Sequence, residues 1–155
     1  MAISIGVTDL ANRVGAELGV SEWLTVTQER IDRFAEATGD HQWIHIDAAR
    51  AAVESPYGST IAHGFLTLSL VSTLLPNAID VTGTRMLINY GCDRVRFVAA
   101  VPVGSRVRGR FVAAAVEAAK DGLQVTWGVT IEREGQDKPC VVLEWRVRYY
   151  PDRQP

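Results

Sequence analysis

The feature that most constrains the fold of this chain is an apolar run from Gly64 to Leu75, followed by Pro76. Its apolar residues lie all round a helical wheel: Phe65, Leu66, Leu68, Leu70, Val71, Leu74 and Leu75. The run is shorter than the roughly 20 residues that a membrane span needs. A helix that is apolar on every side and does not span a membrane must be buried in protein. We therefore expect the rest of the chain to wrap around this helix.

The material that wraps the helix is predicted to be an antiparallel set of strands. Apolar and polar residues alternate, as in half-buried strands, over 83–89, 95–98, 106–112, 123–131 and 140–149. Asp121-Gly122 is a strong hairpin signal. The segment 113–120 is ambiguous, because its alanines favour a helix.

Helices are predicted before the apolar run, over 7–17, 28–38 and 47–53. Thr27 and Asp47 are suited to N-caps, and Gly39 is suited to end the second helix. Helices come first and an antiparallel meander follows, so the fold class is α+β.

Composition excludes several classes of protein. The 155 residues suit one domain. A net charge of −2 offers no field for nucleic acid or anionic membranes. The N-terminal residues do not resemble a signal peptide. Cys92 and Cys140 have no metal-type spacing and are expected to be reduced thiols. We expect a cytoplasmic protein without a membrane or nucleic-acid partner.

Asp40 and His45 are the first candidates for chemistry, because a carboxylate and an imidazole follow a helix end within one short apolar stretch. Such a pair could hold a water molecule and move its proton during addition to a double bond conjugated to a carbonyl. The alternative is that Asp40 caps a turn and His45 packs in the core. Partial burial would favour the chemical interpretation, because it moves both pKa values.

Gly64 is the second candidate. Its N–H, at the start of the buried helix, could hold a developing oxyanion, and the missing side chain would let a thioester approach. Alternatively, Gly64 only permits close packing. His41 and His45 could bind a metal from one helix face, but the Trp43-Ile44-His45-Ile46 alternation argues against a helix there, and no metal is expected.

Five arginines are expected to form a solvated strand face, and in a second interpretation one or two of them meet phosphates of a bound ligand. They are Arg94, Arg96, Arg106, Arg108 and Arg110.

Three stretches of the chain resemble the MaoC-like dehydratases, which include the (R)-specific enoyl-CoA hydratases. They are Phe34 to His45, Ile61 to Phe65, and Asn89 to Phe97 with its continuation Val101 to Gly104. The resemblance covers roughly residues 23 to 150. One departure is that Gln42-Trp43 stands where the family usually has Asn-Pro.

The resemblance implies a single hot-dog domain over residues 1–155, in which an antiparallel sheet wraps a long central helix and 1–22 form an N-terminal helical extension. It also implies a homodimer whose sheets join edge to edge. By similarity, Asp40 is the base, His45 orients the water, and the Gly64 N–H binds the thioester oxygen. His63 and Ser69 are weaker candidates for the substrate pocket.

The expected activity is that of a hydro-lyase, an (R)-specific enoyl-CoA hydratase that forms (R)-3-hydroxyacyl-CoA from trans-2-enoyl-CoA. No cofactor is expected, because CoA is part of the substrate. One alternative is a hot-dog acyl-CoA thioesterase. Another is a non-catalytic acyl-CoA-binding subunit of a dehydratase, although such a subunit would not need the acid–imidazole pair.

Overall fold

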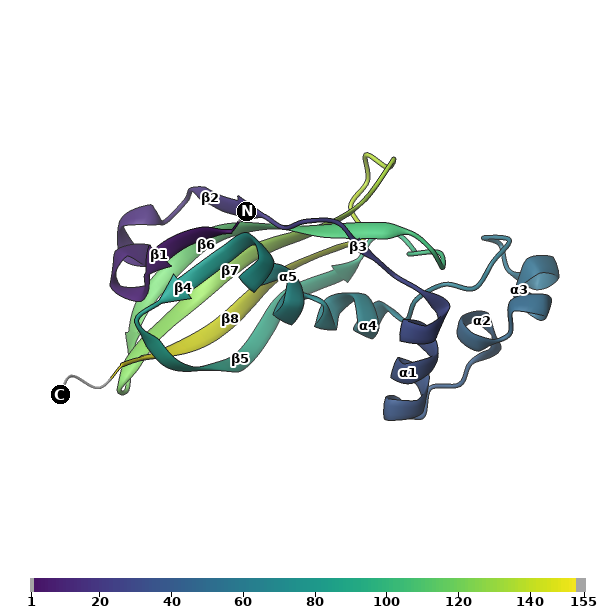
Figure 1. The fold of residues 1–155 in the computed structure, drawn as a ribbon, viewed down its shortest axis with the longest axis horizontal. Helices are drawn as coiled ribbons and strands as arrows, with labels where there is room; N and C mark the ends of the chain where they lie inside the picture. Colours follow the sequence, from purple (N-terminus) through teal and green to yellow (C-terminus); the bar gives the residue numbers. More distant parts are fainter. Residues whose placement is uncertain (1, 153–155) are drawn as a thin grey trace.

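An antiparallel sheet curves around two short consecutive helices in the computed structural model, which describes residues 2–152 (Figure 1). The strand order is β2-β6-β7-β8-β5, and β3 also pairs with β6. The predicted α+β arrangement is confirmed. The strands are β2 (Glu17–Val20), β3 (Leu24–Thr25), β5 (Thr84–Phe97), β6 (Arg106–Ala119), β7 (Gly122–Arg133) and β8 (Val141–Pro151).

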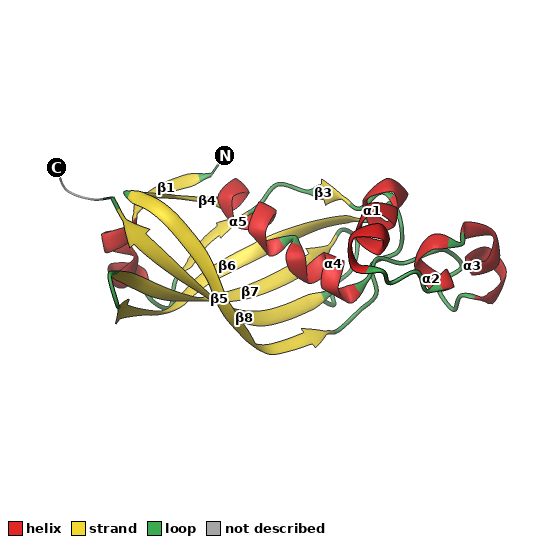
Figure 2. Ribbon diagram, turned by 90° about the horizontal axis from the view of Figure 1, so that it is seen from below, coloured by secondary structure: helices red, strands yellow, loops and turns green. Residues whose placement is uncertain are grey.

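The central helix is divided into α4 (Gly64–Ser69) and α5 (Val71–Ala78), which lie in the hollow of the sheet (Figure 2). The Leu70 N–H is shared between the carbonyls of Leu66 and Thr67, which tightens the chain between the two helices. A proline after an apolar run is expected to end a helix, but Pro76 lies inside α5. The residue lies on an exposed flank, where water can satisfy the carbonyl that its missing N–H leaves free.

The expectation of burial on all sides of this helix is only partly correct. One face packs into the core through Leu66, Leu70, Val71, Leu74, Leu75 and Ala78. The other flank carries Phe65, which is 67% exposed, together with exposed Ser69 and Ser72. An apolar ring at this exposure leaves room for a ligand or a partner against this flank.

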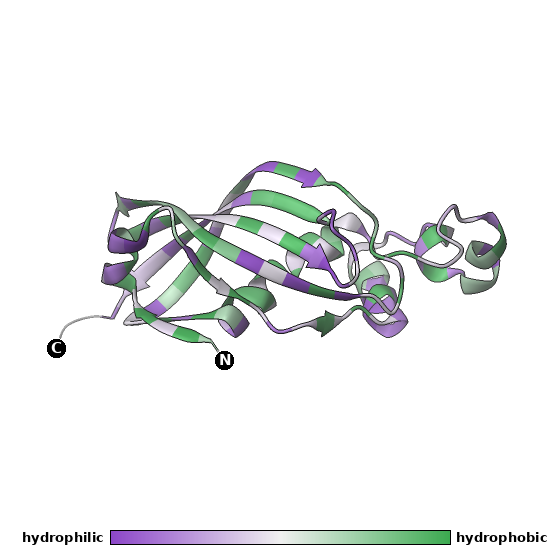
Figure 3. Cartoon of the chain, turned by 90° about the horizontal axis from the view of Figure 1, so that it is seen from above, coloured by the Kyte–Doolittle hydropathy of each residue, from purple (hydrophilic) through white to green (hydrophobic). Residues whose placement is uncertain are grey.

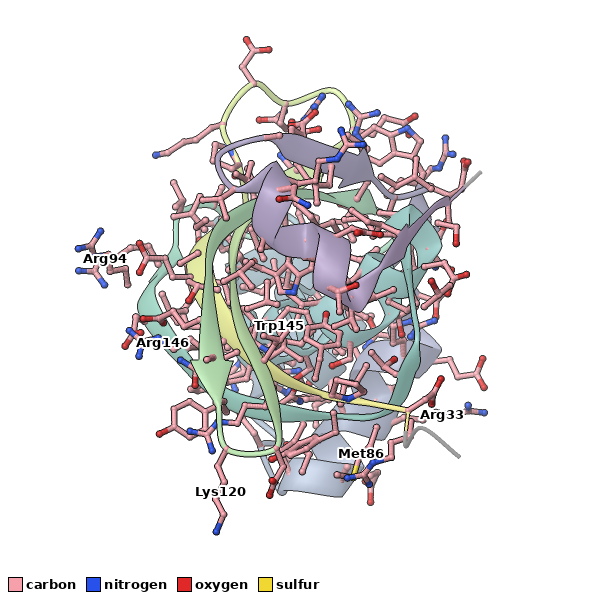
Figure 4. The ribbon with its side chains drawn as sticks, turned by 90° about the vertical axis from the view of Figure 1, so that its left-hand side faces the viewer. Arg33, Met86, Arg94, Lys120, Trp145 and Arg146 are labelled. Atoms are coloured by element: carbon pink, nitrogen blue, oxygen red, sulfur yellow. The ribbon has the colours of Figure 1, made fainter. Side chains whose placement is uncertain are left out.

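Strands β6, β7 and β8 alternate buried with mostly half-buried residues over much of their length, and Figure 3 shows bands of differing hydropathy along them. Trp145 points into the core (Figure 4), and buried Trp127 donates from Nε1 to the Tyr149 hydroxyl at 3.1 Å. The ambiguous segment 113–119 is part of β6, because pairing with β7 overrides the helical preference of its alanines.

The two strands expected over 83–89 and 95–98 are one strand, β5. Shifts of register against β8 accommodate the residues between them, including Arg94, whose φ is 52°. Within the described chain β5 pairs only with β8, so its outer edge is free. Its exposed apolar side chains are Met86, Leu87, Ile88, Tyr90 and Phe97.

The N-terminal segment corrects the expectation of an α-helix over 7–17. A 3₁₀ helix, η1, spans Val7–Arg13 between β1 (Ile3–Gly6) and β2. β1 pairs in parallel with β4 (Ile79–Thr82). Buried Val7 and Leu10 hold η1 against the core, and the chain then continues into β2 beside β6. Residue 1 lies outside the described residues, and the division into one domain with an extension stays a prediction.

Three helices lie at one end of the main sheet, with α1 beside α4 and with α2 and α3 farther out (Figures 1 and 2). They are α1 (Gln28–Thr38), α2 (Trp43–Ile46) and α3 (Ala48–Glu54). The predicted caps are confirmed: Thr27 and Asp47 accept from the backbone at 3.2 and 3.0 Å, and Gly39 is left-handed with φ 77°. No helix in the described part of the chain is long and apolar enough to cross a membrane.

Candidate active site

The candidate site lies where the end of α1, the short helix α2 and the segment before α4 meet. Left-handed Gly39 ends α1 and turns the chain, so that Asp40 follows directly outside the helix. The Asp40 side chain is 53% exposed, and its Oδ1 accepts from the Gln42 N–H at 3.4 Å. The carboxylate can therefore meet water while its backbone stays fixed.

His45 lies on α2 and is 8% exposed. Its Nδ1 is 2.7 Å from the carbonyl oxygen of Ile61. A carbonyl only accepts hydrogen bonds, so Nδ1 carries the proton and the neutral ring presents a lone pair on Nε2.

The expectation that no helix surrounds His45 is wrong. Trp43–Ile46 form one helical turn, which is closed by a hydrogen bond from the Asp47 N–H to the Trp43 carbonyl.

His63 completes a cluster with Asp40 and His45. One polar side-chain atom from each of the three residues lies within 4.8 Å of the others. The His63 ring is 3% exposed and stacks on His45, with ring centroids 3.8 Å apart. Its Nε2 lies 3.0 Å from the Asp40 backbone oxygen and 4.0 Å from Asp40 Oδ2.

The cluster fits a metal ion poorly. His45 Nδ1 and His63 Nε2 both face backbone carbonyls, which leaves His45 Nε2 and His63 Nδ1. Zinc needs nitrogens that converge at about 2.0–2.1 Å. The two rings are tilted by only 24°, so their in-plane lone pairs do not converge well. The expected absence of a metal stays a prediction, and exposed His41 lies outside the cluster, 3.8 Å from Glu36.

Burial is the main cause that lowers the pKa of His45 below its ordinary value of 6.5. The neighbouring His63 lowers it further, whereas the hydrogen bond to the Ile61 carbonyl and the Asp40 carboxylate oppose the shift. His45 is therefore neutral at physiological pH, with Nε2 ready to accept a proton.

Gly64 begins α4 directly after His63, and the Phe97 ring covers it. A Cβ at position 64 would lie 3.0 to 3.2 Å from three carbons of that ring, so any side chain here would push the ring aside. Gly64 also lines a cavity of about 510 Å³ with Thr67, Tyr57 and Arg133. The structure is therefore compatible with both interpretations of Gly64, as an N–H donor to an oxyanion and as a residue that permits close packing.

Ser69 is not brought into the cluster. It lies on the exposed flank of α4, and its hydroxyl donates to the Phe65 carbonyl one turn earlier at 2.7 Å.

Three further residues support the site through contacts that the sequence did not predict. Gln28 donates from Nε2 to the His45 carbonyl at 2.8 Å and so ties α2 to α1. The Ile61 carbonyl sets the proton position on His45, and Phe97 covers Gly64. Each acts across a long sequence separation, so periodicity could not identify it.

Four of the five strand arginines are paired with carboxylates, as a solvated face requires. Arg108 and Arg110 share Glu132, at 2.8 and 2.6 Å. Arg94 and Arg106 pair with Glu144 and Glu134. Arg94 points away from the sheet (Figure 4).

The sheet wrapped around α4 and α5 is a hot-dog arrangement, and the cluster of Asp40, His45 and His63 lies directly before α4. The family model described as "MaoC like domain" matches residues 9–135 of this chain. The chain therefore belongs to the MaoC-like dehydratase family. The predicted family, fold and enzyme class are confirmed.

Relatives with curated names support this assignment. The chain is 51% identical to "3-hydroxyacyl-thioester dehydratase Z" of Mycobacterium tuberculosis over 144 residues, which cover 92% of this chain and 95% of that protein. It is 47% identical to "Nodulation protein N" of Rhizobium leguminosarum bv. viciae over 158 residues, covering 97% and 96%.

Solved structures agree on the fold. The (R)-hydratase from A. caviae has a TM-score of 0.70 and 26% identity, covering 88% of this chain and 98% of that one. The R-hydratase PhaJ1 from Pseudomonas aeruginosa has a TM-score of 0.72 and 22% identity, covering 90% and 83%, and supports the fold alone.

Proposed function

We propose that this chain is an (R)-specific enoyl-CoA hydratase, which adds water reversibly to trans-2-enoyl-CoA and gives (R)-3-hydroxyacyl-CoA. The observation that carries the proposal is the cluster of Asp40, His45 and His63, in which His45 keeps a free Nε2 lone pair. The names of the 3-hydroxyacyl-thioester dehydratase and the (R)-hydratase among its relatives support the same chemistry.

The two acceptors explain how one water molecule is oriented. Ionised Asp40 and neutral His45 each offer a lone pair, and water can donate one hydrogen to each. The water oxygen then presents its own lone pair to C3 of the enoyl group. Asp40 takes a proton as the C3–O bond forms. A proton returns to C2 through the Asp40–His45 pair, so water adds across the double bond and the pair regains its starting state.

The Gly64 N–H is the proposed donor to the thioester oxygen, which gains negative charge as the enolate develops. As the first residue of α4, Gly64 has an N–H without an acceptor one turn earlier in the helix. The adjacent cavity of about 510 Å³ also has Arg133 in its lining, a cation that suits the phosphates of CoA.

The acyl chain is proposed to run along the exposed flank of α4 and α5, past Ser69. A second, mostly apolar cavity of about 210 Å³ lies along this direction, between α5, β5 and β8. Its lining includes Ser72, Leu75, Leu87 and Trp145. An apolar cavity beside the central helix suits a hydrocarbon chain.

The functional unit is proposed to be a homodimer joined at β5. A long edge strand with exposed apolar side chains invites pairing with another chain, and a second copy would cover it. The same contact would approach exposed Phe65 of α4, whose ring lies 5.6 Å from that of Phe97 on β5.

The test is the loss of enoyl-thioester ultraviolet absorbance when the protein is added to crotonyl-CoA and to a longer trans-2-enoyl-CoA. Free thiol is measured in parallel, and a chiral product assay assigns the (R) configuration. Asp40→Asn and His45→Gln are expected to lower kcat by about 10²–10⁴-fold each. His41→Gln, which alters an exposed imidazole outside the cluster, is the matched control and should retain activity.

Release of thiol without hydration would replace the proposal by a thioesterase. Absence of both reactions with either chain length would favour a binding subunit.

A further inference from the structure

We propose that His63 is a positioning residue, which holds both Asp40 and His45 in the arrangement that the reacting water needs. The inference rests on the proposed hydratase function and deepens it, because it assigns the third member of the cluster a role that does not require contact with substrate.

The first contact of His63 fixes Asp40. Its Nε2 lies 3.0 Å from the Asp40 backbone oxygen, and because that oxygen only accepts, Nε2 carries the proton. Asp40 otherwise follows a left-handed glycine at the open end of α1, with a side chain that is 53% exposed. The bond from His63 therefore anchors the peptide from which the carboxylate projects.

The second contact fixes the plane of His45. The rings of His45 and His63 stack with their centroids 3.8 Å apart and their planes at 24°. The His63 ring also packs against Phe34, at a centroid distance of 5.0 Å. His45 is thus held at Nδ1 by the Ile61 carbonyl and across its face by His63. These two restraints leave the imidazole little freedom to rotate, so Nε2 keeps one direction.

The geometry assigns opposite proton positions to the two rings. His45 carries its proton on Nδ1, and His63 carries its proton on Nε2. His63 Nδ1 is then an unprotonated nitrogen, and it is buried without a hydrogen-bond partner among the described residues. Protonating it would place a second positive charge against His45 whenever that ring is charged, and like charges in contact disfavour each other.

The groups that face His45 are few. They are the Asp40 carboxylate at the end of α1, the His63 ring before α4 and the Ile61 carbonyl, while Gln28 of α1 binds its backbone oxygen. Replacing His63 by a residue that cannot be protonated removes a charge–charge repulsion that lowers the pKa of His45. The acid limb of the kcat/KM profile should therefore move to higher pH.

A matched pair of variants separates the two contacts. His63→Gln keeps a donor near the position of Nε2 and removes the ring, whereas His63→Phe keeps a ring and removes the donor. Each variant is expected to lower kcat about 10- to 100-fold, since a misplacement of about 1 Å can cost 10²-fold. KM should change little, because His63 is not proposed to bind substrate, and the acid limb should move upward in both variants.

A second test needs neither activity nor a folded variant of His63. Nitrogen-15 chemical shifts of labelled protein distinguish the two neutral forms of imidazole, and His41→Gln helps to assign the signals of the three histidines. The expected result is Nδ1–H for His45 and Nε2–H for His63. A proton on Nδ1 of His63 would overturn the proposal, because Nε2 could not then donate to Asp40.

The proposal is also overturned if both His63 variants keep kcat within twofold of wild type, or if their acid limbs do not move. Failure of the hydratase function gives a different pattern. Wild-type protein would then leave the enoyl absorbance unchanged while the nitrogen shifts still report the two opposite proton positions.

Discussion

Replacing Gly64 by alanine tests which of the two reasons for this glycine matters to catalysis. The new Cβ would lie 3.0, 3.1 and 3.2 Å from Cδ1, Cγ and Cε1 of Phe97, so the ring must retreat by a few tenths of an ångström. Phe97 is 49% exposed and borders the cavity, so it has room to move. We expect a stability cost of about 1 kcal/mol, at the lower end for overpacking.

The effect on catalysis should be much larger than the effect on stability. If the thioester oxygen reaches the Gly64 N–H, a methyl group beside that donor blocks its approach. Removing one donor of this kind typically lowers kcat by about 10²–10³-fold. A cost of about 1 kcal/mol, in contrast, lowers the melting temperature by only about 2–4 °C for a chain of this size, and the protein remains folded in the assay.

The double variant Gly64→Ala with Phe97→Ala separates the two effects, with Phe97→Ala alone as its reference. In the double variant the Phe97 ring is gone, so the methyl group of Ala at position 64 has no ring to displace. The stability cost of Gly64→Ala should therefore largely disappear in urea unfolding. The loss of enoyl-thioester hydration should persist relative to the reference. If activity returns to that of the Phe97→Ala reference, the glycine serves only packing and the oxyanion role of Gly64 is refuted.

Two further predictions follow from burial and from the free sheet edge. Burial lowers the folded-state pKa of His45 below 6.5, so the unfolded state binds the proton more readily than the folded state. The stability of the protein should therefore rise with pH through the window below about 6.5. Urea unfolding from pH 5 to 7.5 should show that wild type loses more stability at low pH than His45→Gln does. Wild type should scatter light as twice the chain mass of 17.0 kDa, and Ile88→Lys on β5 should shift it toward the single chain. The control Val14→Lys, at an exposed apolar site outside β5, should leave the mass unchanged, and an unaltered dimer in Ile88→Lys would exclude the central part of β5 as the interface.

The sequence by itself determined the features that depend on neighbouring residues. Thr27, Gly39 and Asp47 act within one helical turn, so the start and end of α1 and the start of α3 could be predicted. The α+β class followed from the change of period along the chain. The acid–imidazole pattern after the Gly39 helix end singled out Asp40 and His45, and the resemblance to a known family implied their roles, which stay predictions. The structure brings the two side chains together in one cluster.

Only the tertiary structure decided features that depend on distant partners. Segment 113–119 is a strand because β7 supplies its hydrogen bonds, and the helix over 7–17 is shortened because its end joins the sheet as β2. The role of His63 depends on contacts with Asp40 and His45, which lie 23 and 18 positions earlier in the chain. The proton position on His45 likewise depends on one carbonyl, that of Ile61. Periodicity reports which face a residue presents, whereas these contacts arise only when separate elements pack together, so the chemistry of the site is set by the fold.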